Sequence, residues 1–326
     1  MHRSSIHAAA ALALACAAAP GALFAQDRYP SKPIRIIVTV AAGAPTDVLL
    51  RTVAQELLPR LGQPLVIDNR PGGNVMIGAE VCAKAPADGY SFCAFSSDTM
   101  SVNPHVFSKI PYDPDKDFKP VALMYYLIQG LIATASLPAN SVKELQALAS
   151  ARTMPLNFGT LGTGTNPDVF RQWLNERWKS DIAGIPYKGA NLVMNALVAG
   201  EIHLSRISLG TVGAQARAGK VKVLAVGSSK RSRVFPDVPT YAEVGLDGFT
   251  EQVWWGLLAP AGVPEAAVKR MNSEFARLFR EPKFLEYLDS QFLEPAVDTP
   301  EEFAAFLKQD REHAGLMVKK YKVPRQ

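Results

Sequence analysis

Cysteine and histidine are scarce in this chain of 326 residues, and the few present do not form familiar sites. Only Cys16, Cys82 and Cys93 occur, without CxxC or Cys–His metal spacing. This excludes a disulfide-rich scaffold and a cysteine-based metal centre. Cys82 and Cys93 both lie in apolar stretches. Two interpretations stay open for them: two buried thiols, which we favour, or a single bridge formed in an oxidising compartment.

The sequence also lacks the motifs of common hydrolases. Beyond residue 25 the histidines are His105, His203 and His313; none is spaced as a metal pair, and neither HExxH nor GxSxG occurs. We therefore expect no metal site and no enzymatic activity. A secreted hydrolase is kept as a weaker alternative, because the members of a Ser-His-Asp triad need not be close in sequence.

A strong charge bias is missing as well. The 35 basic and 30 acidic residues give a net charge of +5 without visible clustering, and 48% of the residues are apolar. This is ordinary globular composition, and it gives no reason to expect a nucleic-acid partner.

Long apolar runs are confined to the first residues. Met1 to Arg3 is basic, residues 8–20 are almost all Ala and Leu, and small residues lead to Ala25. This pattern predicts a signal peptide over residues 1–25, too short to span a membrane, and hence an exported protein. The longest later run, residues 121–135, is interrupted by Gln129 and Gly130, which predicts a buried strand and turn.

Strand-like and helix-like patterns alternate along the rest of the chain. Residues 34–40, 65–68 and 90–96 read as strands separated by helical patterns, and a comparable series begins at residue 156. Such an order predicts mostly parallel sheets flanked by helices. We expect two α/β lobes, with the chain crossing near residues 127 and 246. The first lobe then comprises residues 26–127 and 247–326, and the second comprises residues 128–246.

Two loops between a strand and a helix are candidates for anion binding. In the second series, residues 160–165 carry three threonines and two glycines before a helix that we expect Asn166 to cap. The first series repeats the design over residues 42–47, where Thr46 or Asp47 is the expected cap. Free N–H groups at a helix N-terminus bind a carboxylate as readily as a phosphate. One such loop in each lobe suggests a ligand held between lobes that close.

Arg206 stands at the end of an apolar strand pattern, and arginine suits bidentate carboxylate recognition. The alternative is an exposed arginine at a strand end. Tyr187-Lys188-Gly189 either presents a hydroxyl and an ammonium group to the cleft or forms a simple turn.

Many short motifs are similar to those of one family, the Bug/TctC-type periplasmic solute-binding proteins of tripartite tricarboxylate transporters. The resemblance covers nearly all of residues 28–320 and rests on the following segments: Tyr29-Pro30-Ser31-Lys32-Pro33-Ile34, Asn69-Arg70-Pro71-Gly72, Ala87-Asp88-Gly89-Tyr90, Asn103-Pro104, Tyr112-Asp113-Pro114, Pro186-Tyr187-Lys188-Gly189, and Phe235-Pro236-Asp237-Val238-Pro239-Thr240. It implies a two-lobe Venus-flytrap fold that takes up organic acids, with no catalysis and no cofactor. It also implies membrane transporter subunits as partners, and we expect a monomer.

The resemblance assigns ligand-binding positions in both lobes. They are Ala42, Gly43, Ala44, Pro45, Thr46, Asp47, Ser96, Ser97 and Thr99 in the first, and Thr160, Thr163, Gly164, Thr165, Asn166, Tyr187 and Lys188 in the second. The family often has Asp near positions 206–208, where this chain has Arg206 and Ser208. A base in place of an acid favours a second carboxylate, so we expect a dicarboxylate, with aromatic ones such as terephthalate or phthalate as candidates. A sensor subunit that binds the same acid for a signalling partner is the alternative.

Overall fold

The structure is a computed structural model that describes residues 29–249 and 252–326. The expected signal peptide, with cleavage after Ala25, lies outside the described residues. Within the described ranges, no helix has the length and apolar character needed to cross a membrane.

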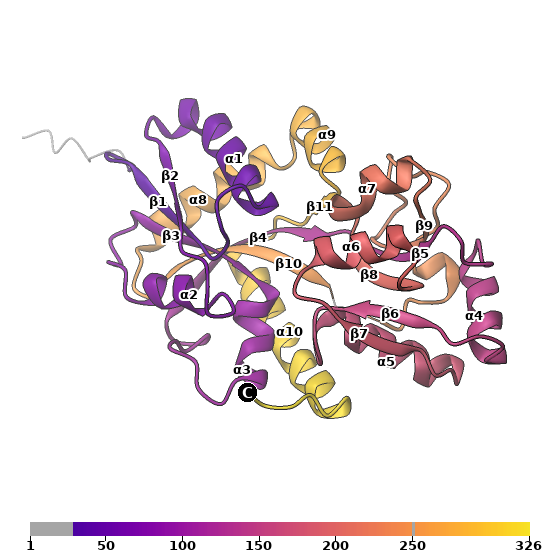
Figure 1. The fold of residues 1–326 in the computed structure, drawn as a ribbon. Coiled ribbons are helices and arrows are strands. Elements are labelled where there is room, and N and C mark those ends of the chain that lie inside the picture. Colours follow the sequence, from indigo (N-terminus) through magenta and orange to yellow (C-terminus); the bar gives the residue numbers. More distant parts are fainter. Residues whose placement is uncertain (1–28, 250–251) are drawn as a thin grey trace, which may run out of the picture.

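Two β-sheets lie side by side and are flanked by helices (Figure 1). The six-stranded sheet has the order β11-β4-β10-β3-β1-β2, and the five-stranded sheet has the order β7-β6-β8-β5-β9. We call each sheet with its helices the first and the second lobe. The strands are β1 Ile34–Val38, β2 Leu65–Asn69, β3 Ser91–Ser96, β4 Phe118–Leu127, β5 Gln129–Thr134, β6 Asn157–Thr160, β7 Ala183–Pro186, β8 Leu204–Ser208, β9 Val221–Gly227, β10 Val253–Pro260 and β11 Leu293–Pro295.

The helices alternate with these strands, as the sequence pattern predicts. They are α1 Pro45–Leu61, α2 Met76–Ala83, α3 Asn103–Val106, α4 Val142–Ala151, α5 Asn166–Trp178, α6 Ala190–Ala199, α7 Leu209–Arg217, α8 Glu265–Leu278, α9 Pro282–Ser290 and α10 Pro300–Lys320, with a π-helical turn η1 Asp98–Val102 and a 3-10 turn η2 Ala242–Val244. The predicted α/β fold class is confirmed.

Each sheet is mixed rather than mostly parallel. The expected parallel order holds for β2-β1-β3 in the first lobe and for β7-β6-β8 in the second. The pairs β3-β10, β10-β4, β8-β5 and β5-β9 are antiparallel. The chain passes from one sheet to the other through β4 and β5 and again between β9 and β10, and these strands account for the four antiparallel pairs; β11 also pairs antiparallel with β4.

The apolar run over residues 121–135 contains the first crossing. It forms β4 and β5, which belong to different sheets and are separated only by Ile128. The N–H of Ile128 donates to the carbonyl of Phe292, and its carbonyl accepts from Leu209. The predicted buried strand is β4, but the predicted turn is wrong, because Gln129 and Gly130 begin β5 of the second sheet.

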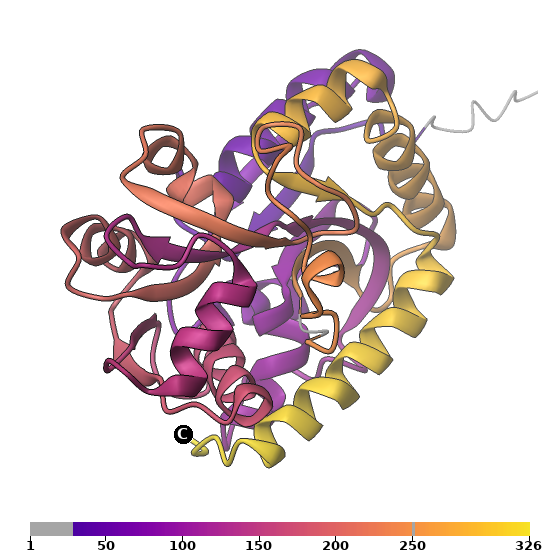
Figure 2. The same cartoon turned by 90° about the vertical axis from the view of Figure 1, so that its right-hand side faces the viewer.

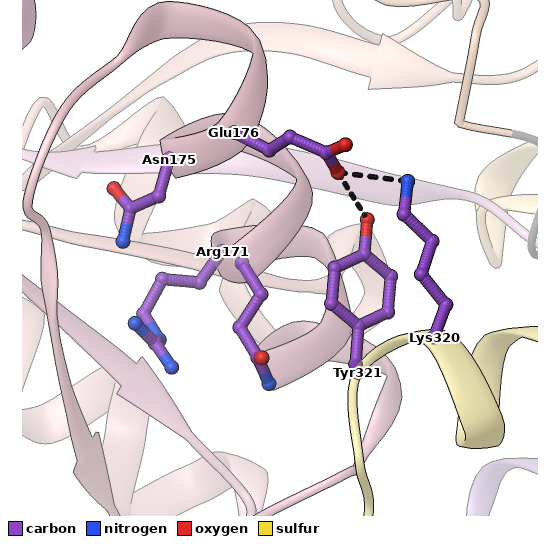
Figure 3. A pocket seen from close by; sticks show the side chains of 6 residues that line it. Arg171, Asn175, Glu176, Lys320 and Tyr321 are labelled. Atoms are coloured by element: carbon purple, nitrogen blue, oxygen red, sulfur yellow. Dashed lines mark hydrogen bonds and ion pairs between the residues drawn. The ribbon is translucent and has the colours of Figure 1, made fainter.

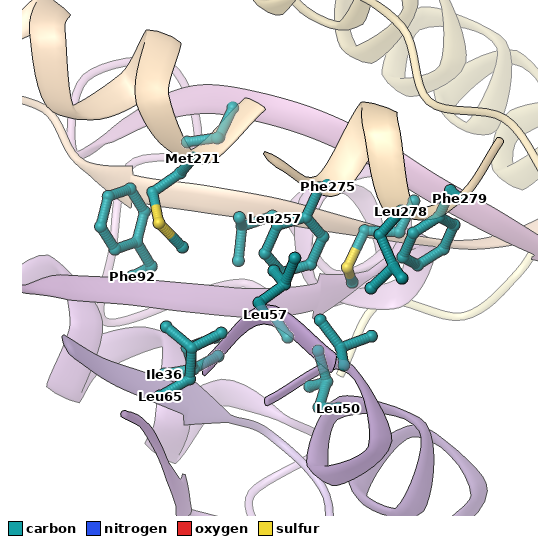
Figure 4. Packing of buried hydrophobic residues seen from close by; sticks show 14 of the residues in the cluster. Ile36, Leu50, Leu57, Leu65, Phe92, Leu257, Met271, Phe275, Leu278 and Phe279 are labelled. Carbon is teal, nitrogen blue, oxygen red and sulfur yellow. The ribbon is translucent and has the colours of Figure 1, made fainter. Parts of the chain in front are cut away.

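Apolar side chains fill both faces of both sheets. In the first lobe, α1 and α8 lie over one face, where Leu57, Phe92 and Phe275 are fully buried (Figure 4). In the second lobe, a corresponding cluster around Phe158, Phe170 and Leu204 lies between α5 and the sheet. These cores fix the strands whose carboxyl ends carry the candidate loops.

Cys82 of α2 and Cys93 of β3 form a disulfide, which corrects the favoured interpretation of two buried thiols. Both residues are fully buried. The sequence alone did not decide between the alternatives because the pairing depends on how α2 packs against β3.

The last helix connects the lobes a third time. α10 runs along the first lobe, and the segment after it ends beside α3 (Figures 1 and 2). Lys320 and Tyr321 contact Glu176 of α5 in the second lobe, while the N–H of Gln326 donates to the carbonyl of Val106 in the first.

Candidate functional site

The predicted ligand loops lie at the carboxyl ends of parallel strands in each lobe. β1 leads into residues 39–44 and α1, and β6 leads into residues 161–165 and α5. In open α/β sheets, this edge is where ligands bind. The first turn of each helix leaves N–H groups without acceptors inside the helix, and such groups attract an anion.

The first-lobe loop is held from inside by Asp47. The carboxylate accepts from the N–H of Gly43 at 2.8 Å, from Nδ2 of Asn69 at 2.9 Å and from Nε of Arg51 at 3.0 Å. Burial alone would raise the pKa of Asp47, but these hydrogen bonds outweigh it and hold the pKa below its usual value. Its oxygens are therefore engaged within the protein.

The second-lobe loop repeats this arrangement around Asp168. Its carboxylate accepts from the N–H of Gly164 at 3.0 Å and from Nη2 of Arg171 at 2.8 Å, and it also accepts from Gln172. In both loops, a glycine with positive φ donates to the aspartate four residues later.

The predicted helix caps are wrong in both lobes. The N-cap residues are Ala44 and Thr165, and neither side chain caps its helix. Thr46 and Asp47 lie inside α1, and Asn166 is the first residue of α5. Each aspartate instead accepts a hydrogen bond from the N–H of a glycine in the loop before its helix.

The three threonines of the second loop differ in availability. Oγ1 of Thr160 accepts from the N–H of Gly162 at 3.4 Å, and Oγ1 of Thr165 donates to the carbonyl of Gly162 at 2.7 Å. Thr163 is exposed, and no described residue bonds to its hydroxyl. In the first loop, Ala42, Gly43 and Pro45 are exposed and Ala44 is half-buried.

The loop after β3 presents a residue that sequence reasoning missed. The predicted Ser96, Ser97 and Thr99 are all buried, whereas Asp98 between them has an exposed side chain. Desolvation raises the pKa of the Asp98 carboxyl. An acidic residue in a serine-rich loop was the available signal.

The remaining second-lobe candidates lie near the same edge. The N–H of Tyr187 donates to the carbonyl of Thr160, which places the turn at residues 187–189 beside the threonine loop. Tyr187 is half-buried and Lys188 is exposed. Ser208 ends β8, and its Oγ accepts from the N–H of Gly210 at the start of α7.

Arg206 is buried, which corrects the alternative of an exposed arginine at a strand end. It is 2% exposed, and its guanidinium carbon lies 5.0 Å from the ring centre of Phe249, 5.3 Å from that of Phe170 and 5.9 Å from that of Tyr241. Aromatic rings at such distances attract a guanidinium group. Direct contact between Arg206 and a ligand carboxylate stays a prediction.

An open hollow lies where α5 meets the end of α10 (Figure 3). Glu176 accepts from Lys320 at 2.7 Å and from the Tyr321 hydroxyl at 3.2 Å, and Arg171, Gln172 and Asn175 complete the lining. Because Arg171 and Gln172 also hold Asp168, the hollow lies behind the second-lobe loop. Among the described residues, no group of His, Cys, Asp and Glu is placed to hold a metal ion.

Known proteins are similar to this chain in sequence and in fold. The sequence model of the tripartite tricarboxylate transporter family receptor matches residues 49–323. The chain is 30% identical to a UPF0065 protein of Bordetella pertussis over 292 residues, 90% of each chain. It is also 30% identical to protein BugT of the same organism over 282 residues, 86% of each chain.

Two solved structures are similar and carry ligands. R. palustris Rpa4515 with adipate has a TM-score of 0.79 and 28% identity, over 91% of this chain and 100% of that one. MatC from Rhodopseudomonas palustris with bound malate has a TM-score of 0.71 and 30% identity, over 89% and 100%. The match over most of the chain confirms the resemblance: this protein belongs to the receptor family of the tripartite tricarboxylate transporters.

Proposed function

We propose that this chain is a periplasmic receptor that captures an organic acid with two carboxylate groups and delivers it to the membrane subunits of a tripartite tricarboxylate-type transporter. Residues 26–127 with 247–326 and residues 128–246 would act as the two lobes that close on the ligand. The adipate and malate in the similar structures support a carboxylate ligand. The finer choice of an aromatic dicarboxylate, such as terephthalate or phthalate, rests on the sequence alone.

The observation that carries the proposal is the matched pair of loops. In each lobe, an aspartate accepts a hydrogen bond from a glycine N–H and fixes the loop, while no side chain caps the adjacent helix N-terminus. An anion at a helix N-terminus gains roughly 0.3–2 kcal/mol, depending on burial. One such end in each lobe suits a ligand with a carboxylate at each end, because both ends are engaged only when the lobes close.

Thermal unfolding and calorimetric titration of the mature chain test this with matched acids: adipate against hexanoate, terephthalate against benzoate, and malate, succinate, phthalate and citrate. A ligand at about 100 times its Kd stabilises a protein by roughly 2.7 kcal/mol. We expect dicarboxylates to raise the Tm and their monocarboxylate analogues to have little effect. Equal shifts from both classes would refute the two-ended site, and no shift from any acid would refute the receptor function in this ligand class.

Thr163→Val supplies a matched variant. The exposed hydroxyl makes no bond to any described residue, so its loss leaves the Tm of the unliganded protein unchanged. We expect the affinity for the preferred dicarboxylate to fall about threefold to tenfold, the equivalent of one hydrogen bond. Unchanged affinity would remove Thr163 from the site.

A further inference from the structure

Asp98 lies between Ser97 and Thr99, two of the predicted ligand-binding residues. Its carboxylate oxygens make no hydrogen bond or ion pair with the described part of the protein. Asp47, at the same sheet edge, is held by Gly43, Asn69 and Arg51. Of these two carboxylates, Asp98 is the one that retains its capacity to accept hydrogen bonds from a bound molecule.

Asp98 is an exposed residue between two buried ones. Its neighbours Ser97 and Thr99 are buried, with 7% and 0% of their surface exposed, yet solvent reaches Asp98 itself. Desolvation raises the pKa of its carboxyl. The turn therefore leaves the carboxylate of Asp98 accessible to a bound molecule, while its two neighbours are packed inside the protein.

The strand register brings Asp98 to the same edge as the first-lobe loop. β1 and β3 are parallel neighbours, with Val38 opposite Ala94, so the segments after both strands leave the sheet together. Residues 42–47 follow β1, and Asp98 begins the turn after β3. The Tyr112 hydroxyl, which donates to the carbonyl of Thr99 at 2.6 Å, supports this turn from behind.

An unpaired carboxylate beside an anion site selects among acids. The carboxylate of Asp98 repels the carboxylate of an unsubstituted acid. It attracts a hydrogen-bond donor on a substituted acid. A hydroxyl or ammonium group on the carbon next to the bound carboxylate would satisfy Asp98 and offset the repulsion. The analogue that lacks the donor is then rejected, because the carboxylate of Asp98 would be left without a partner once the lobes close over the ligand.

We propose that Asp98 is a specificity-determining residue, and that its carboxylate accepts a hydrogen bond from a hydroxyl or ammonium group next to the carboxylate held by the first-lobe loop. The preferred ligand is therefore a hydroxy or amino acid rather than an unsubstituted one. This inference rests on the proposed function and narrows its ligand class.

Matched ligand series test the proposal by calorimetric titration. Succinate, malate and aspartate share one skeleton and differ only in the group that could meet Asp98; glutarate, 2-hydroxyglutarate and glutamate repeat the comparison one carbon longer, and adipate, terephthalate and benzoate complete the panel. The proteins are the wild type, Asp98→Ala, Asp98→Asn and the control Asp181→Asn, which changes an exposed aspartate before β7, at the opposite end of that strand from the loops.

We expect the wild type to bind a hydroxy or amino acid at least tenfold more tightly than its unsubstituted analogue. Asp98→Ala should weaken binding of that acid by about tenfold to hundredfold and leave the unsubstituted acid unaffected or slightly tighter. Asp98→Asn separates the two donors, because an amide oxygen still accepts from a hydroxyl group but no longer neutralises an ammonium group. Asp181→Asn should match the wild type.

Two outcomes overturn the inference and leave the proposed function standing: the wild type binds unsubstituted acids as tightly as substituted ones, or the Asp98 variants weaken all members of a series equally. If no acid in the panel binds the wild type, the proposed function itself fails, and the inference fails with it.

Discussion

Replacing Gly164 by alanine should destabilise the protein more than the equivalent change at Gly43. The two glycines have φ values of +76° and +82°, and each donates its N–H to an aspartate four residues later. Their surroundings differ. A Cβ on Gly43 would meet no atom within 4 Å, whereas a Cβ on Gly164 would lie 2.1 Å from Cγ1 of Val323.

The structure sets the size of the difference. Positive φ costs an alanine about 1–2 kcal/mol at either position. Only Gly164→Ala adds a steric conflict, and forcing extra atoms into a packed contact costs about 1–3 kcal/mol. Val323 cannot simply move aside, because Gln326 is bonded to Val106 and Ser108 by two backbone hydrogen bonds of 2.7 Å. We therefore expect a loss of about 1–2 kcal/mol for Gly43→Ala and about 2–5 kcal/mol for Gly164→Ala.

Calorimetric unfolding measures both losses, at about 2–4 °C in Tm per kcal/mol. Val323→Ala supplies the matched background, since it removes the methyl groups at 2.1 and 2.8 Å and leaves Cβ at 3.0 Å. In that background, Gly164→Ala should cost little more than Gly43→Ala, which gives a coupling of at least about 1 kcal/mol in the double-mutant cycle. Equal losses in the wild-type background, or additive effects of Gly164→Ala and Val323→Ala, would refute the packing of the C-terminal segment on the second-lobe loop.

Three further predictions follow from single contacts. Asp47→Asn and Asp168→Asn should each lower the free energy of unfolding by about 1–3 kcal/mol, because charge-assisted hydrogen bonds to the loop glycine and to arginine are lost. Thermal unfolding near neutral pH measures this difference. For Asp47, whose pKa is lowered, the difference between variant and wild type should vanish as the pH falls through the folded-state pKa. Burial lowers the pKa of His203, and its Nδ1 accepts a hydrogen bond from the N–H of Asn157. The stability of the wild type should therefore fall as the pH drops below about 6.5 and level off below the folded-state pKa. Unfolding midpoints that vary with pH no more in the wild type than in His203→Gln would contradict this. Replacing both Cys82 and Cys93 by serine should lower the free energy of unfolding by about 3 kcal/mol, because the disulfide closes a loop with a sequence separation of 11. A reductant should lower the Tm of the wild type but not that of the variant.

Much of the fold could be predicted because its signals are local. The apolar runs that form β1, β2 and β3 and the helical patterns that form α1 and α2 depend on neighbours within a few residues. Contacts between segments that are distant in the sequence could not be predicted. In the run over residues 121–135, Gln129 and Gly130 predicted a turn, whereas pairing with strands far along the chain makes them the start of β5 in the second sheet.

The candidate site shows the same division. Both loops at residues 42–47 and 160–165 were found from glycines and hydroxyl residues before a helix, which is a local pattern. Which side chains after β3 are exposed was not predictable in that way. Ser96 and Thr99 are the residue types expected around a carboxylate, yet both are buried and Asp98 is exposed, because the π-helical turn rotates its successive side chains in a manner that composition does not specify.

The alternation of side chains along a strand could have predicted that Arg206 is buried. Side chains of a strand alternate between its faces, so Arg206 must share a face with Leu204, which lies in the core cluster beneath α5. That parity was present in the sequence and argues for burial. The sequence pattern around Arg206 does not show what makes the burial tolerable. The rings of Phe170, Tyr241 and Phe249 come from segments far away along the chain, and they surround the guanidinium only after the second lobe has folded. Arg206→Met removes the attraction between the guanidinium and these three rings, so it should lower stability whether or not the guanidinium meets a ligand. Loss of dicarboxylate affinity in that variant therefore counts as evidence of contact only where monocarboxylate affinity is unchanged.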